Sequence, residues 1–368
     1  MRSMCLMLAL AGYSAHAWND DGKCHPLFLE CVSFCDYTCS HSPDLEHIPM
    51  IAEKANILNT NAGLKLADCS MNDDFDRRLQ LPIIVQAIKF IHESFDYTDS
   101  RFAGTTSRFK EYGTLGKSFP GLFSWSCTEH CEYECMHHIA TTMTVPVKFF
   151  GKWPFRRIAI CQEFLSSLYS LLNAVPYAYL FVHKRFRQSG RRSIKFYAIL
   201  ATILWIASAM FHCRDNRATM LFDYFSAFAG VVGNLWLAVY LTVPPDRRSI
   251  VNLLALGLWS SHVGYMALIE FNFEWNMTLA AALAFLANSA WTVWYMTNRY
   301  GGRKHRRLVL VATWILVPLF LLMEANDFPP GPLGLADAHS YWHLSTIPVS
   351  VLWALFFYRE ALYKLSAK

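Results

Sequence analysis

Five polar residues in the C-terminal half of the chain stand where the surrounding sequence is apolar. Ser208 and His212 are four residues apart, His339 and His343 are also four apart, and Asp223 lies between the two pairs. Residues four apart share one face of an α-helix, so each pair can present both side chains to the same neighbour. Because ionisable groups inside a membrane are costly, this pattern indicates a functional site.

The residue types suit a hydrolytic metal site. The three imidazoles of His212, His339 and His343 make a catalytic zinc set when the fourth position is left for water. Asp223 would then accept the proton of that water, and Ser208 would donate a hydrogen bond to the developing oxyanion.

Each of these residues also has a purely structural interpretation. A single histidine at a helix end is more often hydrogen-bonded than a ligand, and Asp223 can pair with Arg214 or Arg217. Ser208 can bond to its own helix backbone. A Ser–His–Asp nucleophilic triad is a further alternative, but it would place Ser208 and His212 on one helix and leave the second histidine pair unused. The joint placement of all five residues favours the metal site.

The composition is that of a polytopic membrane protein. Of the 368 residues, 54% are hydrophobic and 17% are charged, compared with roughly 25% charged residues in average soluble proteins. The formal net charge of +5 does not indicate nucleic-acid binding, because the basic excess lies in short loops between apolar segments. We therefore expect no nucleic-acid partner.

Seven apolar segments predict an all-α membrane protein built as a seven-transmembrane helix bundle. They cover approximately 159–182, 196–213, 219–242, 250–270, 278–297, 308–323 and 338–358. Alternate loops and the C-terminal tail contain sixteen Lys and Arg residues, whereas the opposite loops between segments contain only Arg214 and Arg217. This asymmetry places the N-terminus in the lumen and the C-terminus in the cytosol. It also brings all five polar residues to one depth near the lumenal leaflet.

The N-terminal part has the features of a secreted, disulfide-rich domain. An early Arg2, a short apolar run and the sequence Ala15-His16-Ala17 predict a signal peptide that is cleaved before Trp18. The expected organisation is a signal peptide at 1–17, a lumenal Cys-rich domain at 18–150, a membrane domain at 151–358 and a cytosolic tail at 359–368.

Eight cysteines remain in the lumenal domain after signal cleavage: Cys24, Cys31, Cys35, Cys39, Cys69, Cys127, Cys131 and Cys135. An even number of cysteines in an oxidising compartment implies disulfides, whose pairing the spacing does not decide. The alternative is a zinc site at the last three with the neighbouring histidines. The signal peptide argues against it, because it places these thiols outside the reducing cytosol.

The sequence resembles the post-GPI-attachment-to-proteins factor 3 family, also called Per1-like. The resemblance covers about 125–358, and its motifs include Gly151-Lys152-Trp153-Pro154-Phe155, Gln162-Glu163, Phe211-His212-Cys213-Arg214-Asp215, Asp223-Tyr224-Phe225 and Asp337-Ala338-His339-Ser340-Tyr341-Trp342-His343. The family is part of the CREST superfamily of seven-span metal-dependent hydrolases, and the superfamily's S-x3-H, D and H-x3-H elements are all present. Met220, Phe164 and an insertion at 41–120 depart from the family pattern.

The resemblance implies a zinc-dependent acyl-ester hydrolase of the phospholipase A2 type. It would remove the sn-2 fatty acid of the GPI lipid after the anchor is joined to protein. His212, His339 and His343 would be the zinc ligands, with Ser208 and Asp223 as catalytic residues beside the metal. The implied partners are GPI-anchored proteins with their lipid moiety, and membrane lipids. The implied location is the endoplasmic reticulum or Golgi membrane.

Three other functions are compatible with seven helices. A receptor of the adiponectin type would have reversed termini, which disagrees with the loop charges. A ceramidase-like amidase would share the chemistry, but the Gly-Lys-Trp-Pro-Phe stretch and the cysteine cluster favour the GPI family. A non-catalytic chaperone or ion-homeostasis factor would need neither metal nor hydrolysis, so metal content and lipid analysis distinguish it.

Overall fold

The computed structural model describes residues 146–189, 191–297 and 303–363, together with positions 28, 125, 129, 132, 133, 135–137 and 140. The chain divides into two compact units, one with residues 17–154 and the other containing residues 155–368. The predicted signal peptide, the 41–120 insertion and the cysteines that precede Cys135 lie outside the described residues. Cys135 itself is buried and disulfide-bonded, which is the state that the disulfide interpretation requires of it.

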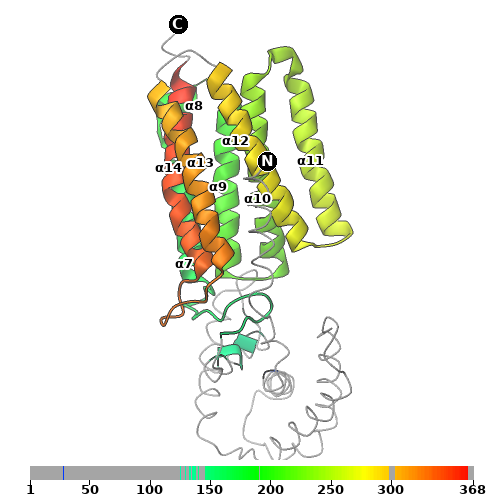
Figure 1. Ribbon diagram of the computed structural model, residues 1–368, viewed down its shortest axis with the longest axis vertical. Helices are drawn as coiled ribbons and strands as arrows, with labels where there is room; N and C mark the ends of the chain where they lie inside the picture. Colours follow the sequence, from blue (N-terminus) through cyan, green and yellow to red (C-terminus); the bar gives the residue numbers. More distant parts are fainter. Residues whose placement is uncertain are drawn as a thin grey trace, which may run out of the picture. The chain divides into compact units, whose positions relative to one another are not determined.

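The second unit is a bundle of long helices (Figure 1). They are α7 (Phe164–Tyr179, extended by the 3-10 turn Leu180–Val182), α9 (Arg192–Cys213), α10 (Arg217–Thr242), α11 (Arg248–Leu268), α12 (Phe273–Thr297), α13 (Arg303–Asn326) and α14 (Ala338–Tyr363). A short helix, α8 (Lys184–Gln188), and the 3-10 turn Pro245–Arg247 lie in the connections.

Six of these helices close into a ring. In order around the ring they are α7, α9, α10, α12, α13 and α14, and α14 packs back against α7. The seventh, α11, packs mainly on α10 and stands at one edge of the bundle (Figure 1). The first, second and last long helices of the chain, α7, α9 and α14, are therefore neighbours.

The bundle has the surface of a membrane protein. Within the described residues, five helical stretches are long and apolar enough to cross a bilayer: Phe164–Val182, Arg192–Cys213, Arg217–Thr242, Pro245–Leu268 and Phe273–Thr297. Leu253, Leu254 and Leu256 on α11 are each at least 60% exposed. Such side chains would be costly in water but not against lipid tails. The expected all-α, multi-pass architecture is thus confirmed.

Two of the seven expected spans do not meet this apolarity criterion. Among the described residues, α13 contributes the shorter apolar stretch Val309–Leu319. The first two turns of α14 contain His339, Ser340 and His343, which lower its hydropathy. Both helices nevertheless pack in the ring, so protein contacts rather than lipid surround much of their polar surface.

Helix ends differ from the expected segments at both ends of the bundle. The first segment was expected from residue 159, but α7 begins at Phe164. Residues before it form a tight turn in which Ile158 and Cys161 exchange backbone hydrogen bonds of 3.0 Å. At the other end, α14 continues to Tyr363, beyond the expected 358.

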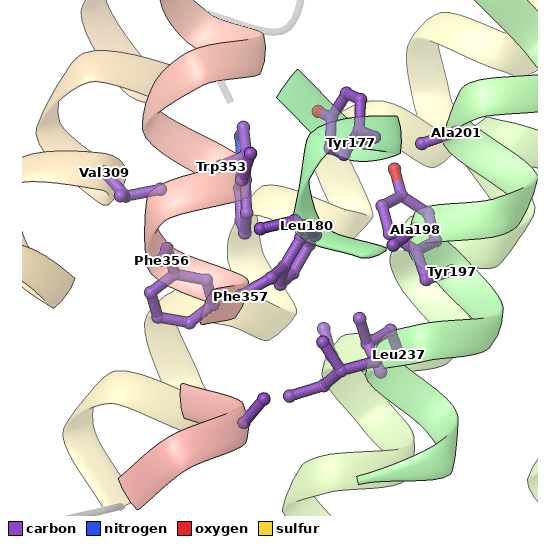
Figure 2. Packing of buried hydrophobic residues seen from close by; sticks show 14 of the residues in the cluster. Tyr177, Leu180, Tyr197, Ala198, Ala201, Leu237, Val309, Trp353, Phe356 and Phe357 are labelled. Atoms are coloured by element: carbon purple, nitrogen blue, oxygen red, sulfur yellow. The ribbon is translucent and has the colours of Figure 1, made fainter. Parts of the chain in front are cut away.

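An aromatic core fills the half of the bundle that lies away from the histidines. Tyr177, Tyr197, Trp353 and Phe357 meet there, with Leu237 of α10 closing the cluster (Figure 2). Tyr197 lies about four turns before His212 on the same helix, α9. This rigid core therefore anchors the three helices whose opposite ends bear the site.

The same half contains a buried ion pair between the last two helices. Arg306 of α13 and Glu360 of α14 form two parallel hydrogen bonds of 2.6 and 2.9 Å. The guanidinium also lies over the Trp294 ring of α12, 4.8 Å from its centre. Arg306 and Glu360 are 4% and 2% exposed. The pair thus joins three helices in a position where neither charge has water as an alternative partner.

Candidate metal site

Three imidazoles meet where α9 ends and α14 begins. His343 Nε2 lies 3.0 Å from His212 Nε2 and 3.0 Å from His339 Nε2. The potential ligand atoms of the three rings all lie within 4.8 Å of one another. His212 and His343 are buried, and His339 is half-buried. The structure therefore brings the three predicted ligands together from helices that are far apart in sequence.

Glu163 determines which ring nitrogen of His212 faces His339 and His343. Its Oε2 lies 2.6 Å from His212 Nδ1, and both side chains are about 5% exposed or less. A carboxylate only accepts hydrogen bonds, so Nδ1 of the neutral ring donates the proton and Nε2 keeps its lone pair. Carboxylate–histidine pairs of this kind orient the ligands of metal sites.

The donor set fits a small divalent cation. In a tetrahedral zinc site with Zn–N bonds of about 2.0–2.1 Å, neighbouring nitrogens lie about 3.3 Å apart. The two short nitrogen–nitrogen distances here are close to that value. Lone pairs that converge at this distance repel one another unless a proton or a cation lies between them. The three histidines are therefore suited to hold a metal ion.

A polar stripe along α7 positions the other two helices. Ser166, Ser170, Asn173 and Tyr177 recur at helical spacing and are all buried. Asn173 donates a 2.9 Å hydrogen bond to the carbonyl of His343 and accepts one of 2.7 Å from Ser350. These two bonds attach α14 to α7 at His343 and about two turns further along the helix.

On its other flank, α7 contacts α9 through Ser167 and through Ser170 of the stripe. Ser167 Oγ donates to the Ala209 carbonyl at 2.9 Å. Ser170 Oγ lies 3.1 Å from Ser208 Oγ and 3.4 Å from His343 Nδ1. Ser208 is thus connected through Ser170 to the back of the His343 ring.

The N-terminus of α14 has a side-chain cap at Asp337, two residues before His339. Asp337 Oδ1 accepts hydrogen bonds of 2.8 Å from both the backbone N–H and the hydroxyl of Ser340. Ser340 Oγ in turn lies 2.8 Å from Ser166 Oγ of α7. Burial raises the pKa of the Asp337 carboxyl above its usual value. In such a dry environment each hydrogen bond to the cap is stronger than it would be in water.

Asp223 lies on α10, outside the group of three ligand atoms. It is half-buried. The ring of its neighbour Tyr224 packs against Phe211, 6.0 Å between centres, and Phe211 directly precedes His212. The structure therefore places Asp223 on the helix next to α9, and its catalytic role stays a prediction.

Sequence reasoning did not identify Glu163, Ser170 or Asn173 as site residues. Glu163 appeared only as part of the Gln162-Glu163 motif. A usable signal was present, because the polar residues of α7 recur at intervals of three and four in an otherwise apolar segment. Their partners, by contrast, lie on other helices, 38 and 49 residues away in α9 and about 170 residues away in α14.

A membrane-embedded helix bundle with three converging histidines at one end defines the class of this protein: a multi-pass membrane protein with a candidate metal site. The model of the Per1-like family matches residues 119–361. The chain belongs to this family, as the sequence motifs predicted.

Animal proteins are similar to this chain over about two thirds of its length. It is 34% identical over 270 residues to a mouse protein named GPI-specific phospholipase A2-like PGAP3, covering 70% of this chain and 82% of the relative. The human protein of the same name is 32% identical over 265 residues, covering 67% and 80%. A Drosophila melanogaster protein named Post-GPI attachment to proteins factor 3 is 32% identical over 253 residues, covering 64% and 74%.

Proposed function

We propose that this protein is a zinc-dependent phospholipase A2 that removes the sn-2 acyl chain from the lipid of GPI-anchored proteins. The observation that carries the proposal is the meeting of three imidazole Nε2 atoms, one of them oriented by the buried Glu163. The names of the relatives supply the lipid, since they refer to GPI attachment and to a GPI-specific phospholipase A2.

The proposed topology has all seven long helices crossing the membrane. The N-terminus, with its signal peptide and Cys-rich domain, would be lumenal, and the tail after α14 would be cytosolic. The sixteen-to-two distribution of Lys and Arg supports this orientation. It places the histidines at the lumenal leaflet of the endoplasmic reticulum or Golgi membrane, where the GPI lipid resides.

The proposed mechanism assigns one task to each residue around the ester. Zinc, when bound by His212, His339 and His343, would polarise the ester carbonyl as a Lewis acid and would lower the pKa of a bound water. Asp223 accepts the proton of the attacking water, and Ser208 donates a hydrogen bond to the oxyanion. Glu163 holds His212 in the tautomer that leaves Nε2 free. Water adds to the ester carbon, the sn-2 oxygen leaves as a hydroxyl, and the products are lyso-GPI and a free fatty acid.

Lipid analysis of cells that lack this protein tests the activity directly. Without it, we expect surface GPI-anchored proteins to retain the unremodelled sn-2 chain, and expression of the full chain to restore remodelling. The measurement is mass spectrometry of the lipid released from purified GPI-anchored proteins. Identical sn-2 chains in the two kinds of cell would refute the proposal.

If the protein is instead a chaperone or an ion-homeostasis factor, we expect a different result when variants are expressed in cells that lack it. Variants of the histidine site would then restore cell growth and GPI composition as well as the wild-type chain does. A ceramidase-like enzyme would instead release fatty acid from ceramide and leave GPI lipids unchanged.

We expect Glu163→Gln to weaken zinc binding by about 10- to 100-fold, because outer partners of ligating histidines typically contribute that much. The amide preserves shape but can present its N–H₂ to His212 Nδ1, which disfavours the required tautomer. The measurement is metal retention of the purified protein during titration with a chelator. Glu270→Gln is the matched control, because Glu270 is an exposed carboxylate at the end of α11. Equal retention by Glu163→Gln and wild type would contradict the assigned role.

Ser208→Ala separates the metal mechanism from a serine nucleophile. In the metal mechanism we expect about a 100- to 1,000-fold loss of hydrolysis, as for other oxyanion donors, and complete loss on chelation. A serine nucleophile would survive chelation, and its covalent acyl-enzyme would be detected by mass spectrometry. Activity that persists after zinc removal would therefore overturn the metal mechanism.

A further inference from the structure

Two cysteines outside the Cys-rich domain lie together beside the candidate metal site. Cys161 is in the turn before α7, and Cys213 is the last residue of α9. Among the described residues both are free, Cys161 being buried and Cys213 half-buried. The two thiols lie close enough to interact with each other, although 51 residues separate them in the sequence.

The backbone holds these two segments side by side independently of the thiols. The amide of Gln162 donates to the Cys213 carbonyl at 2.9 Å, and the amide of Glu163 donates to the His212 carbonyl at 2.9 Å. The turn is itself closed by the backbone bonds between Ile158 and Cys161. The main chain therefore keeps Cys161 and Cys213 on adjacent segments, which a disulfide between them requires.

We propose that Cys161 and Cys213 form a disulfide in the mature protein. The oxidant is a disulfide of an oxidoreductase in the secretory pathway. The Cys161 thiolate attacks it and forms a mixed disulfide, and one oxidoreductase sulfur leaves as a thiol. Cys213 then attacks the Cys161 sulfur, and the second oxidoreductase sulfur leaves as a thiol. Two thiols of this chain are oxidised, one disulfide of the partner is reduced, and both hydrogens pass to the partner.

The location of this bond gives it a role at the site. Cys161 is two residues before Glu163, and Cys213 directly follows His212. The disulfide would thus tie together the two segments that present the Glu163–His212 pair. It would hold that carboxylate against the ring even when α7 and α9 move apart elsewhere. This consequence rests on the proposed function, whereas the disulfide itself needs only the proposed lumenal position of this end of the bundle.

Differential alkylation of the wild-type chain tests the bond itself. The full protein is denatured in excess maleimide without reductant, digested and analysed by mass spectrometry. We expect a linked pair of peptides containing Cys161 and Cys213, and their separate labelling only after reduction. Maleimide on both cysteines without reduction, or a link from either one to the Cys-rich domain, would overturn the proposal. This readout is independent of activity, so it remains decisive if the proposed function fails.

Three serine variants test what the bond contributes. We expect Cys161→Ser, Cys213→Ser and the double variant to lose the same amount of thermal stability, on the order of 5 °C in Tm. Each single variant should also expose one new reactive thiol on its partner cysteine after denaturation. A reductant should lower the Tm of the wild-type chain more than that of the double variant, which serves as the control for the other disulfides. Equal reductant effects on these two proteins would contradict a stabilising disulfide.

Discussion

Replacing His343 by alanine is expected to abolish both metal binding and GPI remodelling. Its Nε2 is the atom that contacts the other two histidines, at 3.0 Å each. Loss of an outer partner alone typically lowers metal affinity 10- to 100-fold, so we expect loss of a ligand to reduce activity by more than about 100-fold. His339→Ala should behave in the same way. The measurements are zinc content of the purified variants and mass analysis of GPI lipids from null cells that express them.

His183→Ala is the matched control for these two variants. Its ring packs against Tyr179 and Tyr358, in the part of the bundle away from the site. We expect it to retain both zinc and full rescue. A His343→Ala protein that is expressed at wild-type level, lacks zinc and still remodels GPI lipids would exclude the metal mechanism. One that retains a full equivalent of zinc would exclude the assigned ligand set.

Replacing Glu360 by alanine is expected to produce the largest loss of stability. Removal of one partner leaves the Arg306 guanidinium buried without its carboxylate, and such changes typically cost about 3–5 kcal/mol. The 2.6 and 2.9 Å hydrogen bonds would both be lost, and Trp294 would remain as a weaker cation–π partner. We expect the Tm in detergent to fall on the order of 10 °C.

Two further variants distinguish a buried charge from a general packing defect. Arg359→Ala, at the exposed neighbouring position, should leave the Tm almost unchanged. A double variant with leucine at both Arg306 and Glu360 should recover most of the loss, because the Arg306 guanidinium is then no longer buried without its carboxylate. If the double variant is as unstable as Glu360→Ala, packing rather than charge determines the effect.

Much of the fold and family followed from local sequence features. The apolar segments predicted the helices of the bundle, because a helix in lipid must satisfy its own backbone hydrogen bonds. The i, i+4 spacing of His339 and His343 was enough to place both rings on one helix face. The motifs around them predicted the family, which the match over 119–361 confirms.

The partners across helices did not follow from local features. The sequence named His212, His339 and His343 as ligands, but their meeting depends on α14 packing beside α7 and α9, not on spacing along the chain. Glu163 illustrates the same limit. Nothing near it in the sequence indicates a histidine, and its partner His212 is 49 residues away on another helix.

The sequence alone determined that this is a multi-pass helical protein of the Per1-like family, and which histidines are candidate ligands. Hydrophobicity, helical spacing and loop charge are local properties, so they are readable without a structure. Only the tertiary structure decided that the ligand atoms converge, that Glu163 orients His212, and that the turn with Cys161 lies beside the end of α9. Those contacts arise from the order of helices around the ring, which depends on packing between segments distant in the chain.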